Sequence, residues 1–170
     1  MEHRILSFDP GLTNTGYALV WAGDYGVLAD PRYSKMLKGP QAGAPEMTVR
    51  DRSDFLGAEA LKVIQEVQPT AIGIEDWTYM GNRGKQESHM PVLVEHLRMV
   101  AKGFGVPVYV FENAAWKKKT LGIGGANKEQ IKHYVGRKVA NPDALARLPQ
   151  HVWDAVGVCF AVLKELGQIK

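Results

Sequence analysis

The chain has a single cysteine, Cys159, and no long apolar run, internal repeat or low-complexity segment. One cysteine excludes an internal disulfide and any cysteine-rich zinc site. No stretch approaches the ~20 apolar residues that span a membrane. The N-terminal MEHRILSFDP has charged residues and no apolar run long enough for a signal peptide. We therefore expect a cytoplasmic protein with no membrane segment.

The length of 170 residues predicts one domain, residues 1–170. A chain of this size buries roughly 70% of its unfolded surface, so it needs no disulfides to form a core. The net charge is only +3, but residues 114–138 hold seven Lys and Arg against Glu129 alone. This basic segment indicates a polyanionic partner, unless it is simply a solvated helix face.

Three candidate strands come first, and later strands alternate with helices. Strands close in sequence can pair antiparallel, whereas strands joined through helices run parallel. The sequence therefore predicts an α/β fold: a mixed five-stranded sheet, its first three strands antiparallel, flanked by helices on both faces. Asn113 and Asn127 are predicted to cap the helices that they begin. The expected strands are 4–8, 16–22, 33–37 (the weakest), 70–75 and 106–111, and the expected helices are 47–67, 88–103, 113–119, 127–139 and 151–166.

Two acids stand where apolar strands end. Asp9 lies in the stretch FDPGLTNTG, and Glu75 closes the stretch TAIGIE. Each has an ordinary explanation, since Asp favours tight turns and an acid can border a core; Asp76 beside Glu75 makes that assignment ambiguous. A charge that directly follows a buried run nevertheless needs a partner or a metal.

The last predicted helix begins with HVWD, in which His151 and Asp154 are three residues apart. This spacing places both on one helix face, where they can point at one ion. The alternative is an ordinary helix N-terminus, which favours an acid. If these two residues meet Asp9 and Glu75, the oxygen-rich site suits Mg²⁺ or Mn²⁺. Two such ions about 3.5–4 Å apart can hydrolyse a phosphodiester, with the basic segment holding the substrate backbone.

Four stretches together resemble the RuvC-type Holliday-junction resolvases. They are FDPGLTNTG, AIGIEDWTYMGN, AAWKKKTLGIGGANKEQI and HVWDAVGVCFA, and they occur in the family's order over nearly the whole chain. The resemblance implies a ribonuclease-H-like fold and a homodimer that pairs through the helix at 88–103. It also implies symmetric nicking of two like-polarity strands of a four-way DNA junction, in the cytoplasm of a bacterium or of a phage-infected host.

The resemblance also assigns roles to individual residues. Asp9, Glu75 and Asp154 would be the metal carboxylates. The fourth position is His151, which would either bind the metal, favouring Mn²⁺ over Mg²⁺, or deprotonate or orient the attacking water. Trp77 and Tyr79 are the candidates for stacking at the opened junction, unless they are core aromatics. The DNA-contacting lysines would be Lys117 and Lys128, with Lys118 and Lys119 as substitutes for the first.

Three other functions share part of this sequence pattern. The same chemistry on a wider range of branched DNA (flaps, forks and three-way junctions) fits the residues too. A non-catalytic junction-binding module would keep the lysines and aromatics but lose the acids, which are all present here. A kinase of the actin and sugar-kinase type also begins with an acid-Gly-Thr turn, but 170 residues leave no room for its second nucleotide-binding lobe.

Overall fold

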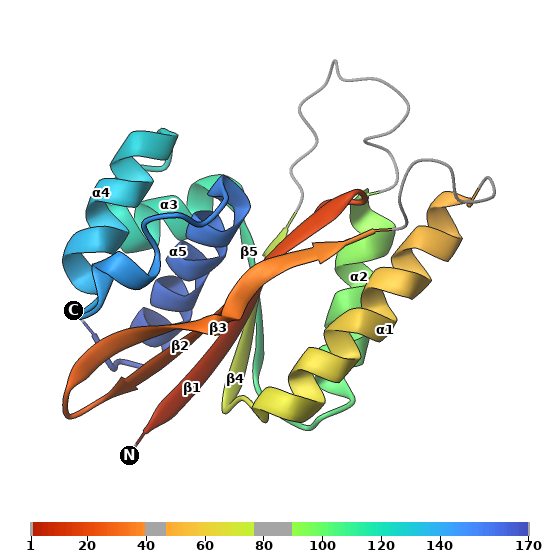
Figure 1. Cartoon of the computed structure of the whole chain (residues 1–170), viewed down its shortest axis with the longest axis horizontal. Helices are drawn as coiled ribbons and strands as arrows, with labels where there is room; N and C mark the ends of the chain where they lie inside the picture. Colours follow the sequence, from red (N-terminus) through yellow and green to blue (C-terminus); the bar gives the residue numbers. More distant parts are fainter. Residues whose placement is uncertain (1, 40–46, 77–89, 170) are drawn as a thin grey trace.

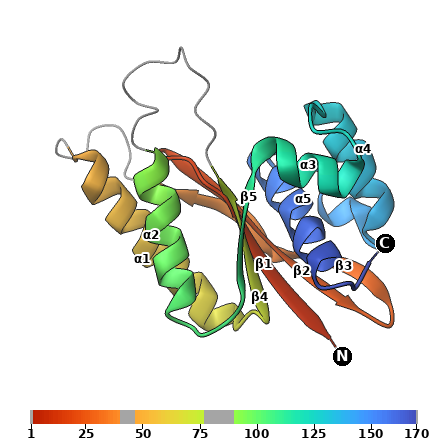
Figure 2. The same cartoon turned by 180° about the vertical axis from the view of Figure 1, so that it is seen from behind.

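The computed structural model describes residues 2–39, 47–76 and 90–169. Its centre is a five-stranded sheet with the strand order β3-β2-β1-β4-β5, covered by helices on both faces (Figures 1 and 2). The strands are β1 (His3–Asp9), β2 (Asn14–Gly23), β3 (Gly26–Lys38), β4 (Ala71–Asp76) and β5 (Val108–Glu112). The helices are α1 (Val49–Val67), α2 (Met90–Lys102), α3 (Asn113–Leu121), α4 (Lys128–Lys138) and α5 (Gln150–Glu165), with a 3₁₀ turn at Pro142–Ala144.

Strand β1 lies at the middle of the sheet. It pairs antiparallel with β2, and β2 pairs antiparallel with β3. On its other side β1 runs parallel to β4, which runs parallel to β5. The mixed sheet and the direction of each pair confirm the fold predicted from the sequence. Because β1 and β4 are parallel, their carboxyl ends, with Asp9 and Glu75, reach the same edge of the sheet.

The sheet separates two apolar cores. Alternate residues of a strand point to opposite faces, so Leu6 and Phe8 pack with α1 and α2, whereas Ile5 packs with α5 on the other face. Helix α5 is buried from Val152 to Leu163 except at Asp154. This burial extends well beyond the single stripe that an amphipathic surface helix presents, because α3, α4 and the sheet all pack against α5. Within the described ranges, no helix has the length and apolarity needed to cross a membrane.

Strand β3 is far longer than the sequence indicated. It spans 13 residues, whereas the alternating pattern predicted only 33–37. Its pairing with β2 is irregular between Tyr17 and Leu19, and this irregularity obscures a period of two. The outer edge of β3 is partly covered, since the Asn141 side chain hydrogen-bonds both the N–H and the C=O of Ala29. Such cover protects an edge strand from pairing with another chain.

Of the two predicted caps, one is confirmed and one is wrong. Asn127 accepts a hydrogen bond from the Gln130 N–H, and the Gln130 side chain bonds back to the Asn127 N–H, as in a capping box. Helix α3, in contrast, has Glu112 in the N-cap position without a side-chain cap bond. Asn113 is already the first residue of the helix, and its side chain extends instead to Glu75.

Candidate metal centre

Asp9 faces helix α5 because of its place in β1. Ser7, two residues earlier on the same face of the strand, donates a hydrogen bond to the Ala155 carbonyl of α5. Asp9 therefore points to the same side and is buried, with 8% of its surface exposed. The turn after it is closed by Thr15, whose hydroxyl bonds the backbone of Gly11. The tight turn that the sequence allowed at Asp9 thus coexists with an acid directed into the protein.

Gly16, opposite Asp9 in the β1–β2 pair, sets how closely α5 approaches. A Cβ at this position would lie 2.5 Å from the carbonyl oxygen of His151. Glycine alone leaves room for the first turn of α5 at this distance. The approach brings His151 Nδ1 to 2.5 Å from Asp9 Oδ2.

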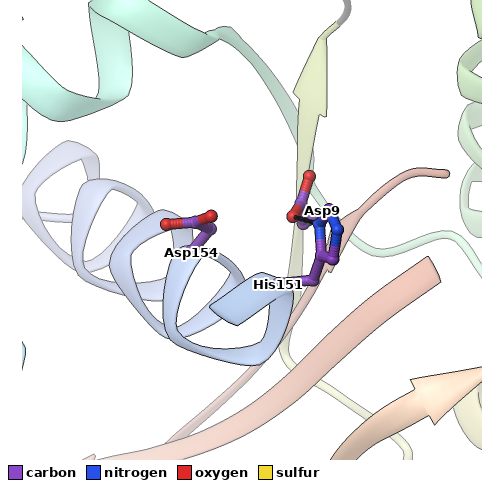
Figure 3. Close-up of side chains that lie close together, drawn as sticks. All are labelled: Asp9, His151 and Asp154. Atoms are coloured by element: carbon purple, nitrogen blue, oxygen red, sulfur yellow. Dashed lines mark hydrogen bonds and ion pairs between the residues drawn. The ribbon is translucent and has the colours of Figure 1, made fainter. Parts of the chain in front are cut away.

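The structure brings Asp9, His151 and Asp154 together. One ligand atom from each lies within 4.8 Å of the others. Figure 3 shows His151 and Asp154 projecting from neighbouring turns at the start of α5, with the imidazole against Asp9. Carboxylate oxygens and an imidazole nitrogen suit a small divalent cation such as Mg²⁺ or Mn²⁺. This donor set therefore fits the metal expected from the sequence.

Glu75 is held beside this group by a different helix. It follows Gly73 on the α5 face of β4, and it is 9% exposed. Asn113 Nδ2 donates to its Oε1, and Trp116 Nε1 donates to its Oε2 at 2.9 Å. The sequence predicted four residues at one point; the structure gathers three of them, and the fourth, Glu75, lies close by on β4, where donors from α3 hold it.

The pKa values of the acids at this site are raised, because several carboxyl groups are buried close together. Burial and the neighbouring charges of Asp9 and Asp154 raise the pKa of Glu75 to about 8. Burial and the Asp9 charge raise the pKa of Asp154 to about 6, and burial also raises the pKa of Asp9. The hydrogen bond to Asp9 raises the pKa of His151. Carboxylates crowded in this way are typical of sites that take a cation or transfer protons.

The predicted DNA-contacting lysines differ in their surroundings. The charge of Lys117 opposes the rise in the pKa of both Asp9 and Asp154, so Lys117 lies within electrostatic reach of the metal centre. Lys118 is exposed. Lys119 forms an ion pair with Glu165 at 2.6 Å, which engages its charge within the protein. Lys128 is the exposed first residue of α4.

Two predicted residues, Trp77 and Tyr79, lie outside the described residues. Sequence reasoning also missed three residues of the site. Trp116 and Asn113 hold Glu75, and Gln150 Nε2 donates to Asp154 Oδ1 at 3.0 Å. The only available signal was indirect: a buried acid such as Glu75 needs donors, and the sequence does not say which helix supplies them.

This strand order, with acids at the ends of β1 and β4 and on α5, matches the ribonuclease-H-like class of nuclease that the sequence predicts. A more specific match follows from comparison with known proteins. The family model of the crossover junction endodeoxyribonuclease RuvC matches residues 5–162, and the chain therefore belongs to this family of DNA-cutting enzymes.

Individual relatives match over nearly their whole length. The RuvC of Chlamydia trachomatis serovar L2 is 24% identical over 172 residues, covering 100% of this chain and 98% of the relative. The RuvC of Syntrophomonas wolfei is 27% identical over 164 residues, covering 94% and 88%. The structure of Thermus thermophilus RuvC in complex with a Holliday junction substrate superposes with a TM-score of 0.76 at 22% identity, covering 99% of this chain and 98% of that one. This last similarity supports the fold.

Proposed function

We propose that this chain, as one domain, resolves four-way DNA junctions by paired symmetric nicks, using Mg²⁺ or Mn²⁺ held by Asp9, Glu75, His151 and Asp154. The observation that supports it best is the convergence of acids and a histidine from distant segments. Asp9 and His151 are 142 residues apart in sequence, yet their side chains are 2.5 Å apart. Buried carboxylates at this density need a cation to neutralise them.

Two bound divalent ions would activate a water molecule and stabilise the leaving oxygen of the phosphodiester. The chain's own residues supply the remaining chemistry. Asp9 is the most deeply placed acid beside His151, and Glu75 approaches from the neighbouring strand. His151 directs Nδ1 at Asp9. The two roles considered for His151, metal ligand and base or orienting group for water, both require it at this place.

The basic segment supplies the DNA contacts in this proposal. The charge of Lys117 acts on Asp9 and Asp154, so in this proposal Lys117 would hold the phosphate next to the cleaved bond. Lys118 on α3 and Lys128 on α4 are exposed and can contact DNA phosphates. Contacts to the phosphate backbone of DNA do not depend on its base sequence. Trp77 and Tyr79 remain the proposed stacking residues.

A homodimer would supply the two active sites that paired nicks require. Helix α2 carries the exposed apolar side chains of Val92 and Met99, which are 47% and 64% exposed. They border a groove of about 780 Å³ between α1 and α2, which has an apolar part that includes Pro91 and Val100 and a polar part formed by Arg50, Asp54, Glu95 and His96. Figures 1 and 2 show these helices on the face of the sheet opposite α5, so pairing here leaves the metal centre open to DNA.

The deciding experiment incubates the protein with a synthetic four-way junction, with Mg²⁺ and separately with Mn²⁺. Symmetric nicks in two like-polarity strands are expected, and Asp9→Asn should bind the junction without cutting it. Flaps, forks and three-way junctions run in parallel measure how strict the substrate choice is. If the wild type binds junctions but leaves every strand intact with either ion, the proposal is wrong.

Light scattering tests the dimer. The wild type should have twice the 18.8 kDa chain mass. Met99→Glu should give a monomer, because a charge buried in an apolar contact loses its hydration. The exposed surface residue Tyr25, which lies on the β2–β3 hairpin, provides a control as Tyr25→Glu. A monomeric wild type at micromolar concentration would contradict coordinated cutting by two subunits.

A further inference from the structure

Both carboxylate oxygens of Glu75 are occupied by donors from one helix. Asn113 and Trp116 are three residues apart on α3, a spacing that places them on the same helix face. Asn113 donates to Oε1 and Trp116 to Oε2. We call this pair the Glu75 clamp. Trp116 is fully buried, and Asn113 is half-buried. Water therefore has limited access to both hydrogen bonds.

The Glu75 clamp is itself fixed against helix α5. A Cβ at Gly157 would lie 2.4 Å from the Trp116 ring, so only glycine at this position leaves room for the indole to pack against α5. One turn further along α3, the Thr120 hydroxyl donates to the Gly157 carbonyl at 3.2 Å. Gly157 lies three residues after Asp154 on the same helix. The indole therefore links the position of Glu75 to the helix that holds two other residues of the metal centre.

Glu75 is only 9% exposed, so the two donors of the Glu75 clamp replace hydrogen bonds that its carboxylate would make to water in the unfolded chain. Hydrogen bonds to an ionised group are roughly twice as strong as neutral ones. A single donor would leave the carboxylate free to rotate, and two donors fix its plane.

On the basis of the function proposed above, we propose that Asn113 and Trp116 are positioning residues that hold the Glu75 carboxylate in the orientation in which it binds the metal. The residue that follows, Lys117, has its amine 5.6 Å from the centre of the Trp116 ring. The same short helix thus orients a metal-binding acid and presents a charge to the DNA.

The test compares Trp116→Phe and Asn113→Ala with a matched control, Trp153→Phe. Trp153 is also buried on α5, but among the described residues its indole N–H has no hydrogen-bond partner. Each variant is measured for Mn²⁺ affinity without DNA, by the electron paramagnetic resonance signal of free Mn²⁺. Loss of a group that orients a metal ligand typically weakens affinity about 10–100-fold. We expect this loss in both clamp variants and less than about a twofold change in the control.

A double-mutant cycle separates positioning from general support of the fold. In a Glu75→Gln background, Trp116→Phe should weaken Mn²⁺ binding no further, because the carboxylate that it orients is gone. With junction DNA, the clamp variants should lower kcat and leave the junction Kd unchanged. Equal losses in the presence and absence of Glu75, or an equal loss in Trp153→Phe, would overturn the proposal.

Two features keep the result interpretable. If Trp116→Phe does not fold, as judged by circular dichroism, Asn113→Ala still tests the clamp, because Asn113 is only half-buried. The Mn²⁺ measurement needs no cleavage. If the wild type leaves junctions uncut but the clamp variants still weaken its Mn²⁺ binding, the proposed function is contradicted and the positioning role is supported.

Discussion

The metal-free protein should lose stability as the pH rises from about 5.5 to about 8.5. The pKa of Glu75 is raised from 4.5 to about 8, and that of Asp154 from 3.8 to about 6. A raised pKa means that the folded chain holds a proton which the unfolded chain has released. The resulting stability is present below the unfolded pKa and is lost as the pH rises through the folded one.

Glu75 makes a large contribution to the expected change, and the raised pKa of Asp9 acts in the same direction. Each pH unit between the unfolded and folded pKa of Glu75 removes about 1.4 kcal/mol, so the interval from about 5.5 to 8 removes roughly 3 kcal/mol. Asp154 adds less than about 1 kcal/mol because its interval ends near pH 6. The raised pKa of His151 acts in the same direction. A loss of this size is a large share of the ~5–15 kcal/mol that stabilises a typical domain.

Urea unfolding in EDTA, followed by circular dichroism at a series of pH values, measures this loss. Glu75→Gln should show a shallower pH dependence, smaller by roughly 3 kcal/mol over the interval. Added Mg²⁺ should stabilise the wild type most at high pH, because a cation binds only the ionised site. A wild type whose stability is constant or rises over this interval would refute the reasoning, as would an unchanged slope in Glu75→Gln.

Other substitutions test the site's construction and its DNA contacts. Gly16→Ala should slow cleavage at least about tenfold, because the new Cβ meets the His151 carbonyl and moves α5; Gly136→Ala, with open space at its Cβ, should leave the cleavage rate unchanged. Lys117→Ala should weaken junction binding and lower its salt dependence by about one ion, measured by fluorescence anisotropy across a salt series. Lys119→Ala should have the smaller effect, since Lys119 is paired with Glu165; equal effects would contradict this distinction.

The strands that are buried on both faces could be predicted from the sequence, because burial requires a continuous run of apolar residues. Strands β1 and β4 are covered on both faces, so each appears as an apolar run that ends at an acid. Strand β3 lies at an edge, and its buried positions alternate irregularly with exposed ones such as Pro31 and Arg32. Its length follows from pairing with β2, which is a long-range contact that no local pattern records.

Within the candidate site, spacing along one helix was easier to predict than contacts between elements. The i, i+3 spacing of His151 and Asp154 correctly placed both on one side of α5, next to Asp9. The surroundings of Glu75 depend on how α3 packs, and this packing is set by Gly157 and Trp116, distant in sequence from each other. For the same reason Asn113 was predicted as a cap: only the folded chain shows that Glu75 is within its reach.

Two glycines allow the close contacts that bring the residues of the candidate metal centre together. Gly16 lets the start of α5 approach β1 and so fixes His151 against Asp9. Gly157 lets the indole of Trp116 approach α5 and so fixes the donors to Glu75. Both contacts converge on α5, and α5 packs against β1, β2 and β4. Because α5 takes part in both contacts, a displacement of α5 would change the geometry around Asp9 and Glu75 together.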